Sequence, residues 1–164
     1  MHKLSDLVMY GIHGVCKIIA VETKIVDKKT VEYYVLEPVC QPGSKYYIPT
    51  QNPAALAKLS PILSRNALDN LLNDPEIHRT AWIDDESCRK QHYKELLNGS
   101  DRGALIQMAH TLIIRRKEQE QLGKKFHQCD EIFLKDALKL LDSEISIIMG
   151  IPQKDVRSFM ESKF

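Results

Sequence analysis

The chain has 164 residues, of which 43% are hydrophobic and 27% are charged, and its formal net charge is +1. These values are ordinary for a globular protein and exclude wholesale disorder. The length allows one domain or two small ones. No apolar run approaches the roughly 18 residues needed to span a bilayer, and residues 1–6 lack the apolar core of a secretory signal. We therefore expect a cytoplasmic protein.

The charge distribution gives one local signal for nucleic-acid binding. A net charge of +1 carries no bulk basic signature, so any contact with nucleic acid must come from local patches. Residues 115–125 form such a patch, with five Lys and Arg residues against two Glu residues.

The first third of the chain predicts a small β module. Segments rich in Val, Ile and Tyr cover residues 4–10, 15–23, 31–37 and 45–48. Several short strands joined by close turns suggest a strongly bent sheet or a small barrel. Asn52 followed by Pro53 predicts a capped helical turn at residues 53–58.

The remainder of the chain predicts helices. Residues 59–64 are expected to be an extended connector, with Ser64 as the first N-cap. Asp84 is the expected N-cap of the second helix, and Gly150 is the expected end of the longest. The predicted helices cover residues 64–73, 84–97, 101–121, 129–149 and 152–160. The sequence therefore predicts an α+β protein, with a β domain at 1–58 and a helical domain at 59–164.

The sequence contains no motif that would indicate catalysis. There is no GxSxG, P-loop, GxGxxG or HExxH pattern. The acidic cluster at 84–86 fits a helix N-terminus, which the helix macrodipole makes favourable for negative charge. His13 lies among small residues and fits a turn better than a general base. Because the four cysteines are scattered and form no CxxC pair, we expect no metal site, and we also expect no cofactor and no enzymatic activity.

The N-terminal half resembles a known family. Residues 5–10 (SDLVMY) and 13–15 (HGV) resemble the start of the polymerase-interacting domain of the CarD/CdnL/TRCF family, roughly G-D-x-V-x-Y-x-x-H-G-V. Ser5 stands where that pattern has glycine. Residues 32–36 (EYYVL) and 47–49 (YIP) also fit in order.

The C-terminal half resembles the same family. The family places a Trp before the first long helix of its DNA-binding domain, and this chain has Trp82 there. Residues 98–101 (NGSD), 114–116 (IRR) and 123–125 (GKK) follow in the same order. The family usually continues with Leu-Ser, whereas this chain has Phe-His at 126–127, so we expect a weak N-cap on the long helix.

The resemblance implies a transcription regulator with two binding modules. It implies a Tudor-like β-barrel at residues 1–58 that binds the β subunit of bacterial RNA polymerase, through the positions of Lys24 and Tyr47. It implies that the helical domain binds promoter DNA at the upstream edge of the transcription bubble, largely without sequence readout, and stabilises the open complex. Trp82 would enter the minor groove as a wedge. The candidate phosphate contacts are Arg79, Arg89, Lys90, Lys124 and Lys125. The protein would then be found on the nucleoid through RNA polymerase.

Other interpretations stay open on the residues alone. Trp82 could be a core residue, and each basic residue could belong to a solvated charged face. The chain would then be a protein-interaction adaptor without DNA binding, or an enzyme with an unrecognised site. The acidic cluster at 84–86 would also oppose the approach of phosphate near Trp82.

Overall fold

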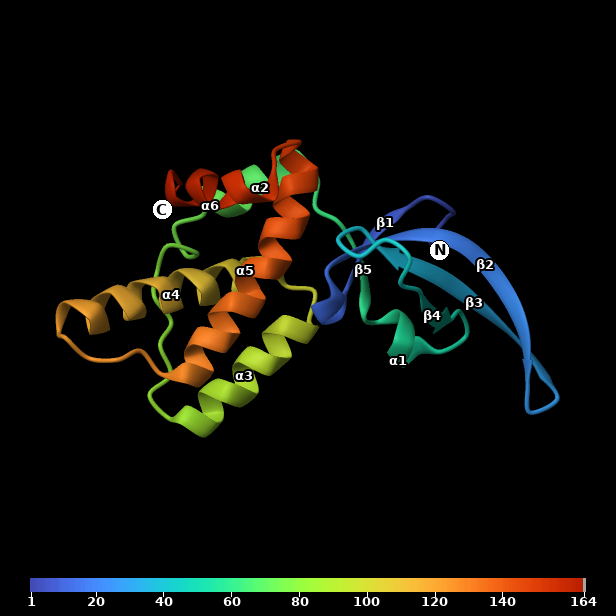
Figure 1. Ribbon diagram of the computed structural model, residues 1–164, viewed down its shortest axis with the longest axis horizontal. Coiled ribbons are helices and arrows are strands. Elements are labelled where there is room, and N and C mark those ends of the chain that lie inside the picture. Colours follow the sequence, from blue (N-terminus) through green and yellow to red (C-terminus); the bar gives the residue numbers. More distant parts are fainter. Residues whose placement is uncertain (164) are drawn as a thin grey trace. The chain divides into compact units, whose positions relative to one another are not determined.

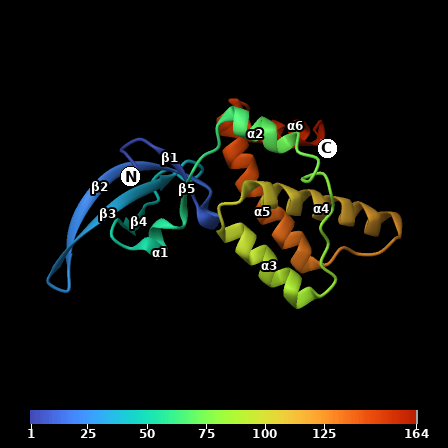
Figure 2. The same ribbon diagram turned by 180° about the vertical axis from the view of Figure 1, so that it is seen from behind.

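The computed structural model describes residues 1–163, which divide into two compact units, residues 1–62 and a second unit that begins at Leu63 (Figures 1 and 2). The first unit is an antiparallel sheet and the second is helical, so the predicted α+β class is confirmed. No helix within the described residues is both long enough and apolar enough to cross a membrane.

The sheet unit contains five antiparallel strands in the order β4-β3-β2-β1-β5. The strands are β1 (Leu7–Tyr10), β2 (Val15–Val26), β3 (Lys29–Pro38), β4 (Tyr46–Pro49) and β5 (Leu59–Pro61). β2 and β3 form a long curved hairpin (Figure 1). Within the described residues β4 and β5 form the two edges of the sheet, so the Tudor-like sheet is bent but not closed as a barrel.

The end of the sheet unit differs from the extended connector that the sequence suggested. Residues Leu59–Pro61 pair with β1, with Tyr10 opposite Leu59 and Val8 opposite Pro61. Leu59 is buried in the core of this unit, and Pro61 is tolerated because β5 is an edge strand. Just before it, the turn α1 (Pro53–Leu56) begins as predicted, because the Asn52 side chain accepts hydrogen bonds from two N–H groups of its first turn.

The core of the sheet unit lies on one face of the strands. Its buried members are Val8, Cys16, Ile18, Tyr34, Leu36, Ile48 and Leu59. This burial raises the pKa of the Cys16 thiol to about 11, and the neighbouring Cys40 adds to the shift. The core therefore lies at the end of the β2–β3 hairpin that is away from its turn, where β1, β4 and β5 pack.

The backbone conformation of Ser5 explains why the family pattern quoted above has glycine at this position. Its φ is +70°, in the left-handed region that residues with a Cβ adopt at an energetic cost. The conformation lets the Ser5 N–H donate to the Ile18 carbonyl at 2.8 Å, which fixes the entry into β1. The chain therefore keeps the turn without the glycine that suits it best.

The helical unit is built around its longest helix, α5 (Gln128–Met149). The other helices are α2 (Arg65–Leu72), α3 (Glu86–Asn98), α4 (Arg102–Gln121) and α6 (Gln153–Glu161). Helices α3, α4 and α6 all contact α5, and Figure 1 shows α3 and α4 on its flanks. Apolar side chains at helical spacing from α4 and α5 fill the space between them.

The helix ends follow the sequence with one correction. Ser64 caps α2, and Gly150 ends α5 in the left-handed conformation, as predicted. Asp85, not Asp84, caps α3: its Oδ1 accepts from the Cys88 N–H at 2.7 Å. These bonds lower the pKa of the Asp85 carboxyl. At the start of α5 His127 makes no side-chain cap, which confirms the weak N-cap.

Two buried ion pairs join the helices of this unit. Arg102 on α4 pairs with Glu144 on α5 at 2.6 Å, and Glu144 also accepts from the Leu63 N–H. Arg89 on α3 pairs with Asp130 on α5 at 2.9 Å. Buried pairs of this kind hold elements in one arrangement, because separating them would leave a charge without a partner.

Candidate functional site

Trp82 lies in the segment between α2 and α3. Three hydrogen bonds from side chains of α4 hold this segment in place. The Gln107 side-chain amide donates to the carbonyls of Glu76 at 2.7 Å and Arg79 at 3.2 Å. The Thr111 hydroxyl accepts from the Ala81 N–H at 3.0 Å. The backbone just before Trp82 is therefore fixed to a rigid helix.

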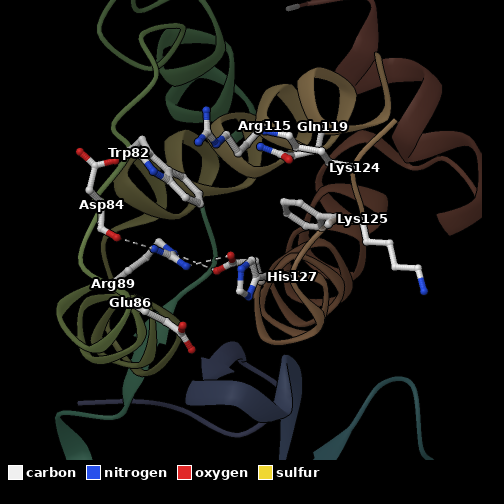
Figure 3. A pocket seen from close by; sticks show the side chains of 11 residues that line it. Trp82, Asp84, Glu86, Arg89, Arg115, Gln119, Lys124, Lys125 and His127 are labelled. Atoms are coloured by element: carbon white, nitrogen blue, oxygen red, sulfur yellow. Dashed lines mark hydrogen bonds and ion pairs between the residues drawn. The ribbon is translucent and has the colours of Figure 1, made fainter. Parts of the chain in front are cut away.

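The indole of Trp82 lies between two guanidinium groups. Its ring centroid is 4.3 Å from the guanidinium carbon of Arg89 and 4.8 Å from that of Arg115. Figure 3 shows the two groups on opposite sides of the ring. Contacts of this kind contribute about 0.5–1 kcal/mol when exposed and about 2 kcal/mol when desolvated. Trp82 is half-buried, so it is a surface residue in a fixed pose and not a core residue.

Arg89 is the anchored member of this arrangement. Its Nε and Nη2 donate to the two carboxylate oxygens of Asp130, at 2.9 and 3.0 Å, and its Nη1 donates to the Ile83 carbonyl at 2.9 Å. Burial acts to lower the pKa of Arg89, but the hydrogen bond and charge of Asp130 outweigh it and the pKa is raised. Arg89 is only 3% exposed, which leaves it almost no surface for a phosphate.

A hollow of about 420 Å³ opens beside Trp82 (Figure 3). This volume lies within the range of about 300–1,000 Å³ that is typical of ligand sites. One part of its wall is basic and comes from the end of α4 and the segment after it, with Arg115, Lys124 and Lys125. Another part is acidic, with Asp84 and Glu86 at the start of α3.

Part of the acidic charge around this hollow is already matched. Glu86 forms an ion pair with Lys90 one helical turn later, and this contact lowers the pKa of Glu86. Asp130 is used by Arg89, and Asp85 by the cap of α3. The acidic cluster at the start of α3 therefore opposes an approaching anion less than the sequence suggests.

The predicted phosphate contacts fall into three groups. Lys124 and Lys125 are exposed and line the hollow together with Trp82. Arg79 and Lys90 lie outside its lining, and each pairs with a nearby glutamate, Arg79 with Glu76 at 3.1 Å. Arg89 also lines the hollow but is buried. The geometry thus favours the two lysines as phosphate contacts.

Sequence reasoning missed several side chains of this site. Arg115 and Gln119 lie one turn apart on the same face of α4, and Phe126 follows the two lysines. The signal for Arg115 was present, because it begins the basic stretch at 115–125. No local pattern indicated that this residue would lie over Trp82, 33 positions earlier in the chain.

The sheet unit brings together the two residues that were expected to bind polymerase. The Lys24 ammonium lies 3.5 Å from the centroid of the Tyr47 ring, although one residue is on β2 and the other on β4. The Tyr33 ring contacts Tyr47 edge-on at 6.4 Å. Glu22 lies 3.9 Å from Lys24. Tyr47 is 39% exposed, so these four residues form an accessible mixed patch.

Two comparisons with known proteins bear on this arrangement. Residues 3–62, almost the whole sheet unit, match the family model described as the CarD-like/TRCF RID domain. Over 161 residues the chain is 25% identical to a Bacillus subtilis (strain 168) protein named "Putative transcription factor YdeB", a match that covers 97% of this chain and 99% of that protein. The similarity to YdeB thus extends through the helical unit as well.

The domain description and the name of the relative together support a transcription-related role that involves RNA polymerase. Over residues 3–62 the match to the family model confirms the resemblance seen in the N-terminal half of the sequence.

Proposed function

We propose that this protein regulates transcription by binding the β subunit of RNA polymerase with its sheet unit and promoter DNA with its helical unit. The helical unit would contact the upstream edge of the transcription bubble and stabilise the open complex. The observation that carries the proposal is Trp82, held at the surface between two guanidinium groups beside a hollow with a basic wall.

Trp82 supplies the contact with the opened duplex. An aromatic side chain in the minor groove beside a base step replaces stacking that the DNA loses when it kinks. Stacking of a base on an aromatic ring is worth about 1–3 kcal/mol. Because the ring is already held in one pose, little of this energy is lost in ordering it on binding.

The basic wall supplies the contacts with phosphate. Lys124 and Lys125 are exposed and free to reach the DNA backbone, and Arg115 adds a third positive charge next to Trp82. Arg79 and Lys90 are candidates at the margin of the same surface. Phosphate contacts position a protein without reading sequence, which is consistent with action at many promoters.

The patch of Lys24 and Tyr47 supplies the contact with the polymerase β subunit. Tethering through this patch raises the concentration of the helical unit near DNA to about the millimolar range. A chain with a net charge of only +1 can then act on DNA, although its own electrostatic attraction is weak. Tighter binding to the melted than to the closed promoter shifts the equilibrium toward the open complex.

The test is the lifetime of the open complex on a promoter fragment with the cognate polymerase. We expect the wild-type protein to lengthen the lifetime, and Trp82→Ala to remove most of that effect while still binding polymerase. Lys139→Ala, an exposed basic residue of α5 that does not line the hollow, serves as the control. If Trp82→Ala acts like wild type, the adaptor without DNA binding becomes the better account.

A further inference from the structure

We infer that Arg89 and Asp130 are positioning residues for Trp82, and that Arg89 is not itself a contact to DNA. The inference rests on the proposed function, since it concerns how the wedge is held. It assigns a role to Asp130, a buried carboxylate that the sequence gave no reason to connect with Trp82.

The Arg89 guanidinium is fixed by hydrogen bonds on two of its edges. Both of its outer edges are used: Asp130 on α5 accepts two hydrogen bonds, at 2.9 and 3.0 Å, and the Ile83 carbonyl accepts a third at 2.9 Å. Arg89 is 3% exposed and Asp130 is 1% exposed. A planar guanidinium with both edges bonded in this way cannot rotate without breaking several bonds.

The fixed guanidinium then sets the position of the indole. Its central carbon lies over the Trp82 ring, 4.3 Å from the centroid, and the Ile83 carbonyl that it binds belongs to the next residue in the chain. The ring and the backbone beside it are therefore held by the same group. This connection links Trp82 to α5 as well as to α3.

Arg115 cannot supply this anchor from the opposite face. It is half-buried, and its ion pair is with Glu118 on its own helix, at 3.2 Å. A pair between partly exposed residues three positions apart fixes a side chain weakly. The rigid side of Trp82 is thus the side of Arg89 and Asp130.

The helical unit contains a matched control for this role. Arg102 and Glu144 form a second buried pair between an arginine and a carboxylate, at 2.6 Å, and they also join another helix to α5. Their side chains are 5% and 2% exposed, close to the 4% and 1% of Arg89 and Asp130. No contact between this second pair and Trp82 is among those of the described residues. Damage to either pair should weaken the fold, but only damage to the first should release the indole.

The experiment compares Asp130→Asn with Glu144→Gln. Trp82 is the one tryptophan in the sequence, so fluorescence excited at wavelengths that tyrosine does not absorb reports on it alone. We would measure acrylamide quenching of each free protein at a temperature where it is folded, and then the open-complex lifetime. We expect quenching of Trp82 to rise in Asp130→Asn and to stay at the wild-type value in Glu144→Gln.

The lifetime effect should follow the same division. We expect Asp130→Asn to reduce the lengthening of the open-complex lifetime about threefold to tenfold, as the loss of one aromatic–cation contact and of its ordering allows. Glu144→Gln should keep the wild-type lifetime. Equal changes in quenching and lifetime for the two variants would reduce the pair of Arg89 and Asp130 to a general structural role and overturn the inference.

A second variant covers the case in which Asp130→Asn does not fold. Arg89→Lys keeps the positive charge but loses the two hydrogen bonds to Asp130 and the planar guanidinium, and it should show the same rise in quenching.

The measurements distinguish failure of the inference from failure of the proposed function. If Trp82→Ala shortens the lifetime while Asp130→Asn and Arg89→Lys leave quenching and lifetime unchanged, the inference alone fails. If Trp82→Ala has no effect on the lifetime, the proposed function fails, whatever quenching shows.

Discussion

The two units of this protein each place a cation against an aromatic ring at the surface, but they hold the cation differently. In the sheet unit Lys24 is a flexible ammonium over Tyr47, and its ion-pair partner is a partly exposed glutamate 3.9 Å away. In the helical unit Arg89 is buried and bonded to both oxygens of Asp130. The first contact can rearrange when a partner arrives, whereas the second keeps its ring in place. Under the proposed function, the adaptable surface is the one for the protein partner and the preset surface is the one for DNA.

The largest expected effect is on the anchored cation. Asp130→Ala should lower the free energy of unfolding by about 3–5 kcal/mol, because it leaves Arg89 charged and buried without its partner. Glu22→Ala, which removes the partner of Lys24, should change it by less than about 0.5 kcal/mol, because that pair is exposed. Urea unfolding of both variants measures the difference. Similar losses in the two variants would break the comparison.

The adaptable contact should matter for binding rather than for stability. Lys24→Glu should lower the affinity for polymerase about tenfold, because it reverses a charge at the centre of the patch. It should leave acrylamide quenching of Trp82 at the wild-type value. Titration against the isolated β subunit gives the affinity, and Lys17→Glu, an exposed charge near the start of the same strand, is the control. An unchanged affinity would remove Lys24 from the polymerase contact.

A smaller effect is expected at the start of the sheet unit. Ser5→Gly should raise the free energy of unfolding by about 0.5–1 kcal/mol, because it relieves the left-handed strain but adds freedom to the unfolded chain. Ser44→Gly, in the exposed turn before β4, should not be stabilising and serves as the control. Thermal unfolding measures both. A destabilised Ser5→Gly would contradict the strained geometry at φ +70°.

The smallest effect concerns a buried histidine of the helical unit. Burial lowers the pKa of His110 from its ordinary 6.5, and the neighbouring His78 and Lys117 add to the shift. The unfolded chain therefore takes up the proton more readily, so this contribution to stability is present above pH 6.5 and is lost as the pH falls through the lowered value. His110→Gln should lose less stability than wild type between pH 7 and 5 in urea unfolding. A parallel pH profile would contradict the assignment.

Local signals in the sequence predicted local structure well. Asn52 and Ser64 are N-caps, as their side chains favour, and Gly150 ends α5, as its backbone freedom favours. The errors arose where two neighbours compete or where distant strands meet. Asp84 and Asp85 are the same residue type and both could cap a helix. Only the backbone path shows that Asp85 is the N-cap of α3. The pairing of β5 depends on β1, about 50 residues earlier, so residues 59–61 looked like a connector.

The candidate site was predicted by resemblance more than by pattern. Trp82 and the two lysines after Gly123 were identified in this way, and they line one hollow. The pairing of Arg89 with Asp130 joins residues 41 positions apart, and in the sequence Arg89 looks like any exposed helix arginine. Only the packing of α3 on α5 shows that its charge is satisfied inside the protein. Burial, which the sequence does not display, separates a supporting arginine from one with surface open to a phosphate.

The most direct test of the central claim is to place a photo-crosslinking amino acid at position 82 and map what it captures. The account predicts a crosslink to DNA at the upstream edge of the transcription bubble in complexes with polymerase, and none on the same promoter fragment without polymerase. The same probe at Lys139, away from the hollow, should give no DNA product. Crosslinks from position 82 to protein alone, or to DNA irrespective of polymerase, would contradict the account.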